Sequence, residues 1–176
     1  MIVFDANFLI FFLDPKLNKG KKSDPRIDYL ISVIEKTNDR IVIPTPALSE
    51  LMVGADGAIS DYLEIIHASK FFRIEPFGER AAIELATMTR VAIAMGRKRG
   101  AAAEDAPWAK VKFDRQILAI ARVVGATTIY SNDGDLVELS KEVGTPALRL
   151  EDLRYPPVPP QTELEFRQSS DLVDEN

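Results

Sequence analysis

Short runs of β-branched and aromatic residues alternate along this chain with longer stretches of helical periodicity, and this alternation restricts the fold more than any other feature. Five runs predict strands: MIVF at the start, then RIVIPTP, FFRIEPF, TTIYS and PALRL. The pattern of helices is found in residues 8–13, 26–36, 47–54, 58–70, 79–96, 108–124 and 133–144. Strands separated by helices pair in parallel, and the helices cover both faces of the sheet. The sequence therefore predicts an α/β fold with a central, mainly parallel sheet.

The composition divides the chain into a body and a C-terminal tail. With 176 residues, 46% of them hydrophobic, the chain can form one domain with a real core. We predict a domain over residues 1–154 and a flexible, acidic, Pro-rich tail over residues 155–176. The tail contains five acids and one arginine, so it carries −4 of the net charge of −5. The body is nearly neutral, and its charge neither requires nor excludes a nucleic-acid partner.

Two absences narrow the class of protein. There is no cysteine, which excludes disulfides, thiol nucleophiles and thiolate metal sites and fits a cytoplasmic protein. The apolar opening run, MIVFDANFLIFFLD, is interrupted at Asp5 and is too short to span a membrane. No basic residue precedes it and no small-residue cleavage site follows, so it does not read as a signal peptide. We expect a cytoplasmic protein with no membrane association.

Acidic residues follow three of the predicted strands. Asp5 comes directly after the first strand, Glu50 lies on the short helix after the second, and Asp133 and Asp135 follow TTIYS. Ligands in parallel sheets bind beyond the carboxyl ends of the strands, so we expect these acids to share one edge of the sheet.

A further acid, Asp114, occupies the core-facing stripe of its predicted helix. Three apolar residues share its face: Ile117, Leu118 and Ala121. An apolar residue would be expected at this position, and a buried carboxylate is costly unless it is paired or binds a metal. Asp114 could pair with Arg115, Lys112 or a distant cation, or it could belong to the acidic edge.

The other acids also have purely structural explanations. Asp5 or Asn7 could cap the first helix, and Asp133 could cap a helix that begins at Gly134. Glu50 could be an ordinary exposed helix residue. Taken together, however, four acids converge on one edge with no matching set of basic residues at the strand ends. Like charges held close together repel in a low dielectric, and a bound divalent cation would relieve that repulsion.

The residue types favour one kind of chemistry. Oxygen ligands alone suit Mg²⁺ or Mn²⁺ rather than structural zinc. The single histidine, His67, lies beside apolar helix positions, so Ser-His and Cys-His catalysis have no support. Neither a P-loop nor a dinucleotide fingerprint is present. Metal-assisted hydrolysis of a phosphodiester is therefore favoured over nucleotide-driven chemistry.

Four blocks of the sequence, in order, resemble the blocks of the PIN-domain nucleases, including the VapC-type toxins. They are VFDANFLI, PALSELMVG, KFDRQILAIAR and TTIYSNDGDL. The resemblance covers residues 1 to 150 and implies a three-layer α/β/α fold. It also implies a metal-dependent endoribonuclease, a hydrolase of phosphodiester bonds in single-stranded RNA, with Mg²⁺ or Mn²⁺ as cofactor.

The resemblance assigns roles residue by residue. Asp5, Glu50, Asp114 and Asp133 would form the catalytic, metal-binding quartet. Asp135 would be an auxiliary acid, and Asn7 and Ser131 would orient ligands or water. As a VapC-type toxin, the protein would be paired with an antitoxin and would form a homodimer. An RNA-processing nuclease outside a toxin pair, and a PIN-like scaffold that binds RNA or protein without cutting, remain as alternatives.

An acidic site needs basic surroundings to hold RNA. Lys112 and Arg115 are the preferred RNA-binding residues, because their helix also carries Asp114; Lys110 is a further candidate nearby. Basic loops at residues 16–26 and 97–99 could serve instead. Trp108 could stack on a base, although a place in the core or an interface is favoured.

Overall fold

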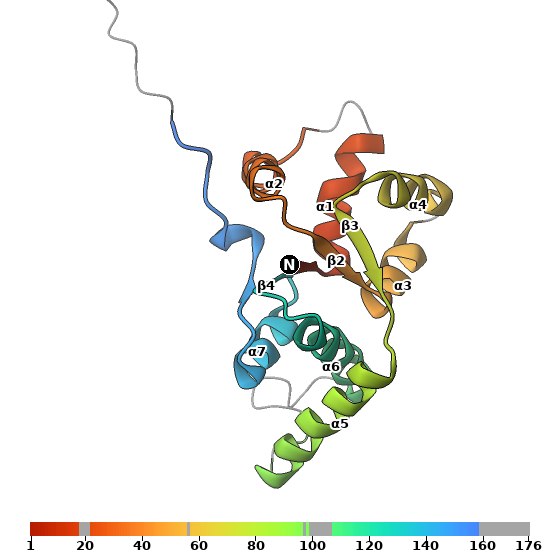
Figure 1. Cartoon of the computed structure of the whole chain (residues 1–176), viewed down its shortest axis with the longest axis vertical. Coiled ribbons are helices and arrows are strands. Elements are labelled where there is room, and N and C mark those ends of the chain that lie inside the picture. Colours follow the sequence, from red (N-terminus) through yellow and green to blue (C-terminus); the bar gives the residue numbers. More distant parts are fainter. Residues whose placement is uncertain (18–21, 56, 97, 99–106, 159–176) are drawn as a thin grey trace, which may run out of the picture.

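The computed structural model describes residues 1–17, 22–55, 57–96, 98 and 107–158 (Figure 1). Its centre is a five-stranded sheet with the strand order β3-β2-β1-β4-β5. The strands are β1 (Ile2–Phe4), β2 (Ile41–Pro44), β3 (Phe72–Glu75), β4 (Thr128–Tyr130) and β5 (Ala147–Leu148). Every neighbouring pair is parallel, and β1 aligns with both of its neighbours, Ile2 opposite Ile41 and Phe4 opposite Tyr130. The predicted α/β class with a parallel sheet is confirmed.

Two layers of helices cover the sheet. The helices are α1 (Ala6–Leu17), α2 (Pro25–Thr37), α3 (Thr45–Gly54), α4 (Ile59–Ala68), α5 (Glu79–Ala94), α6 (Trp108–Val123) and α7 (Gly134–Val143), followed by the short 3₁₀ helix η1 (Leu150–Asp152). The first four helices pack mainly on one face and α5–α7 on the other (Figure 1). This split follows from the topology, because right-handed crossovers place helices on opposite faces when the chain changes direction along the sheet.

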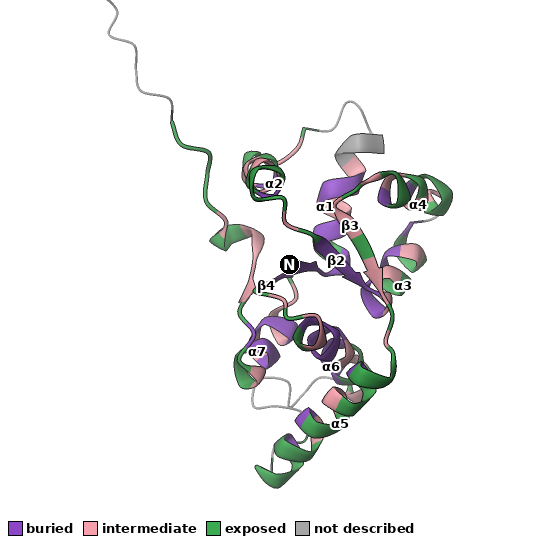
Figure 2. Ribbon diagram, in the orientation of Figure 1, coloured by how far each residue is buried: buried purple, intermediate pink, exposed green. Residues whose placement is uncertain are grey.

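The alternating side chains of β1 divide the core in two. Ile2 and Phe4 face the layer of α1–α4, where Phe8 and Leu13 pack against them, whereas Val3 faces the layer of α5–α7. All three strand residues are buried. Figure 2 shows β1 and β2 as buried, the edge strand β3 as intermediate to exposed, and much of α5 as exposed. The first strand is thus held rigidly from both faces.

Element boundaries differ from the sequence prediction at a few points. Helix α1 continues to Leu17, beyond the predicted end at residue 13, and there Asp14 accepts a hydrogen bond from the Tyr62 hydroxyl of α4 at 2.6 Å. Strand β5 has two residues rather than five, since Arg149 already caps the 3₁₀ helix η1. In the described part of the chain, no helix is both long and apolar enough to cross a membrane.

The predicted tail begins where regular structure ends. Residues 155–158 form no helix or strand, and the Arg26 guanidinium lies 5.2 Å from the centre of the Tyr155 ring. Residues 159–176 lie outside the described part of the chain, as do 18–21, 97 and 99–106 of the two basic loops. The boundary between domain and tail, and the flexibility of the tail, stay predictions.

Candidate functional site

The candidate site lies where the chain reverses its direction along the sheet. Strand β1 starts in the middle; the chain adds β2 and β3 on one side, then crosses to β4 and β5 on the other. The crossovers from β1 and from β4 therefore leave to opposite faces, which opens a crevice beyond their carboxyl ends. Asp5 follows β1 and Ser131 follows β4 at this point.

Asp5 is fixed at the end of β1 by backbone and side-chain hydrogen bonds. Its backbone N–H donates to the carbonyl of Tyr130 at 3.0 Å, which continues the pairing of β1 with β4. One carboxylate oxygen accepts from the Ala6 N–H at 2.7 Å, and the other accepts from the Ser131 hydroxyl at 2.6 Å. The side chain is buried. Asp5 directly precedes α1, so it can cap this helix and also belong to the site.

The loop after β4 connects Asp5 to Asp133. The Ser131 hydroxyl donates to Asp5 and accepts from the Asp133 N–H at 3.0 Å. Asp133 is the N-cap of α7, and its Oδ1 accepts from the N–H of Asp135 at 2.8 Å and of Leu136 at 3.4 Å. The capping explanation for Asp133 is thus confirmed, and the cap holds its carboxylate at the carboxyl edge of the sheet.

Asp114 approaches the same place from α6. It is 5% exposed and shares a buried face with Ile117, Leu118 and Ala121, as the helical pattern predicted. Its Oδ2 is buried and has no hydrogen-bond partner among the described residues. Neither Arg115 nor Lys112 neutralises it through an ion pair that the structure describes. A buried carboxylate oxygen left in this way is costly unless something absent from the protein alone satisfies it.

The electrostatics of the acids show that they form one cluster. Burial and the charge of Asp133, with smaller contributions from Asp5 and Glu50 and against the charge of Lys110, raise the pKa of Asp114 to about 7. Burial also raises the pKa of Asp5, against the hydrogen bonds from Ser131 and Ala6. Partial burial and the charges of Asp5 and Asp133 raise the pKa of Glu50, although Glu50 lies at the exposed rim. The structure therefore brings all four predicted acids into electrostatic contact.

A lysine enters this cluster from the first turn of α6. The Lys110 ammonium lies 3.0 Å from Asp133 and also contacts Asp135. Burial opposes its charge, but the hydrogen bonds to Asp135 and Asp133 raise the pKa of Lys110 overall. The sequence pointed to Lys110 only as a basic neighbour. Its spacing of four residues from Asp114, which places both on one helix face, was the signal for a direct role.

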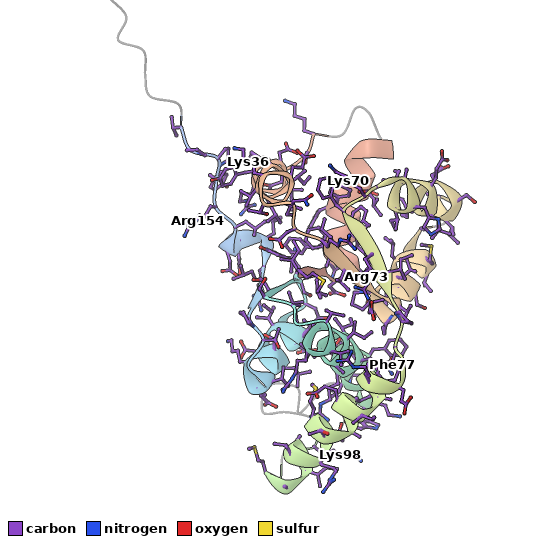
Figure 3. All side chains as sticks on the ribbon, viewed as in Figure 1. Lys36, Lys70, Arg73, Phe77, Lys98 and Arg154 are labelled. Atoms are coloured by element: carbon purple, nitrogen blue, oxygen red, sulfur yellow. The ribbon has the colours of Figure 1, made fainter. Side chains whose placement is uncertain are left out.

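The preferred RNA-binding residues have different positions. Lys112 is exposed, so it stays available to a polyanion. Arg115 is only 3% exposed; it lines a cavity of about 360 Å³ between α5, α6 and α7, with its guanidinium 5.7 Å from the Trp108 ring centre. Its position on α6 turns Arg115 into the helical layer, so the role of Arg115 in RNA binding stays a prediction that its burial does not support. Figure 3 shows Lys98 near the outer end of α5, and its ammonium lies 4.8 Å from the same ring.

The remaining predicted residues surround the cluster. Asn7 is exposed in the first turn of α1, two residues after Asp5. Ser131 is buried, and Asp135 is partly buried beside Lys110. Within the described residues, no group of three or more acidic or histidine side chains is arranged to hold a metal ion. The carboxylates instead turn to Ser131, to backbone N–H groups and to Lys110.

Comparisons with known proteins identify the fold. No protein-family model and no curated protein sequence matches the chain. Among solved structures, a chain of FitAB bound to an IR36 DNA fragment superposes with a TM-score of 0.59 at 18% identity, covering 88% of this chain and 99% of that one. VapBC2 from Rickettsia felis, bound to a DNA fragment from their promoter, gives 0.58 at 16% identity, covering 85% and 98%. The chain therefore has the fold of these FitAB and VapBC structures, as the resemblance to PIN domains implied.

A third structure agrees with the other two. DNA-bound VapBC from Salmonella typhimurium superposes with a TM-score of 0.56 at 19% identity, covering 85% of this chain and 97% of that one. The expected three-layer α/β/α PIN-like fold is therefore confirmed. In this PIN-domain fold, the four sequence blocks converge on the carboxyl edge of β1 and β4, where their acids form the cluster described above.

Proposed function

We propose that this protein is a metal-dependent endoribonuclease that hydrolyses phosphodiester bonds in single-stranded RNA, and that it is the toxin of a toxin–antitoxin pair. The observation that carries the proposal is Asp114: a buried carboxylate with an unpartnered oxygen, on a helix of a PIN-domain fold, within electrostatic reach of three other acids. Structural carboxylates are satisfied by donors inside the fold. A carboxylate that is not satisfied this way, and that faces like charges, is arranged for a cation.

The donor set fits Mg²⁺ or Mn²⁺. Asp5, Glu50, Asp114 and Asp133 offer only hard carboxylate oxygens, and the part of the chain that the structure describes contains no cysteine and one exposed histidine. These four residues would hold the ion. When bound, it would activate water and stabilise negative charge on the phosphoryl oxygens.

The surrounding residues would position the acids of this site, and one acid, Glu50, would also take part in proton transfer. The Ser131 hydroxyl and the Ala6 N–H orient the two oxygens of Asp5. The N-terminal turn of α7 holds Asp133 through its cap. Glu50, as the most open of the four acids, is the group best placed to take a proton from water at its carboxylate. Lys112 is exposed near the start of α6 and would contact RNA phosphates.

The toxin assignment has separate support. The similar structures are FitAB and VapBC complexes bound to DNA, one of them to a fragment from their promoter. By analogy, a protein partner would hold this chain inactive, and the chain would form a homodimer. Expressing the chain alone should then slow bacterial growth, and Asp5→Asn should relieve the effect. Normal growth with abundant soluble wild-type protein would favour an RNA-processing nuclease outside any toxin pair.

The decisive experiment is an RNA cleavage assay on the full chain. Single-stranded RNA is incubated with added Mg²⁺ or Mn²⁺, with and without excess chelator, for the wild type and two variants. Asp5→Asn removes a charge from the cluster, whereas Asp61→Asn removes one from an exposed position on α4. Metal-dependent cleavage by the wild type and Asp61→Asn, but not by Asp5→Asn, is the expected result. Cleavage that persists in excess chelator refutes the metal mechanism, and a folded wild type that never cuts RNA supports a non-catalytic scaffold.

A further inference from the structure

The acidic cluster has two sides that differ in how their charge is balanced. On the α7 side, the Lys110 ammonium contacts both Asp133 and Asp135. These contacts join residues 23 and 25 positions apart in the sequence, so they tie the start of α6 to the start of α7. The Lys110 side chain is 38% exposed. One side of the cluster therefore already has a cation.

On the other side, no described cation is in direct contact with the acids, although the charge of Lys110 also lowers the pKa values of Asp5 and Asp114. Asp5 is held by neutral donors, the Ser131 hydroxyl and the Ala6 N–H. Asp114, buried next to it, leaves Oδ2 without a partner. Asp114 lies on the buried face of α6, and the charges of all three other acids act on it, opposed by that of Lys110. The buried side of the cluster is thus the one that needs an added cation.

We propose that Lys110 is a built-in counter-ion that occupies the Asp133–Asp135 side, so that the site takes one divalent metal ion, on the Asp5–Asp114 side, and a second ion is excluded while Lys110 is in place. This inference rests on the proposed function. An ammonium in contact with two carboxylates removes the negative charge that would attract a second ion, and it repels that ion directly. Both carboxylate oxygens of Asp133 lie 3.0 Å from the Lys110 ammonium, so Asp133 can give only part of its charge to the one ion that the four acids would hold and has none left for a second.

An alternative explanation is that Lys110 forms an ordinary surface ion pair. Exposed pairs of this kind contribute little and would leave metal binding unchanged. Lys141 provides the matched control, because its ammonium contacts the carboxylate of Glu138 on the surface of α7, outside the cluster. Comparing variants of Lys110 and Lys141 therefore distinguishes a counter-ion of the site from an ordinary surface ion pair.

The test measures the number and affinity of bound Mn²⁺, by isothermal titration calorimetry and electron paramagnetic resonance, on the full chain without RNA. The variants are Lys110→Met, which keeps most of the stem and removes the charge, Lys110→Arg, which keeps the charge, and Lys141→Met. We expect one Mn²⁺ per chain for the wild type, Lys110→Arg and Lys141→Met. We expect a second Mn²⁺ for Lys110→Met, with the first bound at least tenfold more tightly. Lys110→Gln takes the place of Lys110→Met if the latter does not fold.

Two results would overturn the inference: a wild type that binds two Mn²⁺ ions, or a folded Lys110→Met whose number of ions and affinity equal those of the wild type. The RNA cleavage assay shows whether such a result contradicts only the role of Lys110 or also the proposed nuclease function. A wild type that binds Mn²⁺ and cuts RNA, beside an unchanged Lys110→Met, refutes only the role of Lys110. A wild type that binds no Mn²⁺ and cuts no RNA refutes both.

Discussion

Two consecutive residues of α6, Asp114 and Arg115, are both charged and both almost completely buried, yet their surroundings have opposite characters. Each leaves a buried polar atom without a hydrogen-bond partner among the described residues, Oδ2 of Asp114 and Nη1 of Arg115. Asp114 faces the carboxyl edge of the sheet, among acids of like charge. Arg115 faces the layer between α5 and α7, where its walls are mainly apolar and Glu142 supplies an opposite charge.

The comparison shows that burial of a charge does not by itself mark a site. Burial lowers the pKa of Arg115, and the charge of Glu142, an exposed residue of α7, opposes this shift. The pKa of Asp114 is raised by burial and then raised again by its neighbours, because several acids converge on it. Like charges that converge in a buried place destabilise the fold, so such a cluster indicates a site that binds a ligand of the opposite charge.

The largest expected effect separates activity from stability at Asp114. Asp114→Asn should lower RNA cleavage by more than about 100-fold, since loss of groups that merely support metal ligands already costs 10–100-fold. The metal-free variant should melt at the same temperature as the wild type or higher, because one of the mutually repelling charges is gone. Added Mg²⁺ should stabilise the wild type more than the variant. Thermal melting with and without Mg²⁺, beside the cleavage assay, measures both.

The opposite pattern would return Asp114 to a structural role. If Asp114 were needed as an ion-pair partner, breaking that buried pair would cost about 3–5 kcal/mol. A variant that melts well below the metal-free wild type but still cuts RNA would show this, and the contrast with Arg115 would disappear.

The second prediction uses the pKa of Asp114 to measure the repulsion directly. The folded value is about 7 and the ordinary value 3.8, so between them the folded chain binds more protons than the unfolded chain. The free energy of unfolding of the metal-free protein should therefore fall as the pH rises through this window, by up to about 1.4 kcal/mol per pH unit for this group. Asp114→Asn should flatten that decline.

Urea denaturation at several pH values, without metal, provides the measurement. The raised pKa values of Asp5 and Glu50 act in the same direction, so the variant should keep a smaller slope. Parallel pH profiles for the wild type and Asp114→Asn would mean that Asp114 has an ordinary pKa and that the cluster is looser than the structure shows.

Most of the fold could be predicted because its signals are local. Each strand is a short apolar run, and each helix has a stripe of apolar residues with breakers at its ends; helix α6, for example, follows Pro107 and is followed by Gly125. The boundaries that differed depend on tertiary contacts. Beyond the predicted end of α1, Asp14 accepts a hydrogen bond from the Tyr62 hydroxyl, 48 positions away, and no pattern within the segment could show this contact.

The acidic part of the site could also be predicted, whereas its cations could not. Asp5 and Asp133 follow strands, and strand ends converge in any parallel sheet. The direction of a basic side chain depends on rotation about the axis of α6. Within six residues, Lys110 turns to the acids, Lys112 to solvent and Arg115 to the core. Composition marked all three as basic, but only the packing of the helix separates them.

A third prediction tests how the cluster is held together. Ser131→Ala removes the hydroxyl that donates to Asp5 and accepts from the Asp133 N–H. We expect RNA cleavage to fall by about 10–100-fold, as for other residues that orient metal ligands. Ser140→Ala is the matched control, because Ser140 is equally buried and donates only to the Val137 carbonyl.

The free energy of unfolding of both serine variants shows whether a loss of activity comes from a less stable fold. Each loses a buried hydrogen bond, so both should unfold more easily by about 1–3 kcal/mol. If Ser140→Ala lost as much activity as Ser131→Ala, the activity change would reflect the fold and not the orientation of Asp5.

The smallest expected effect is at Arg115 and completes the comparison with its neighbour. Arg115→Met keeps a long apolar stem against Leu118 and the Trp108 ring and removes a guanidinium that is buried with an unpartnered nitrogen. Replacing a buried charge by an apolar side chain of similar volume is often neutral or stabilising, so the free energy of unfolding should change by less than about 1.5 kcal/mol. RNA cleavage should stay within a few-fold of the wild type, measured beside Arg122→Met on the same cavity wall. A folded Arg115→Met that has lost cleavage would place Arg115 in RNA binding after all. A loss of about 3–5 kcal/mol would instead show that the guanidinium belongs to a buried ion pair of the core.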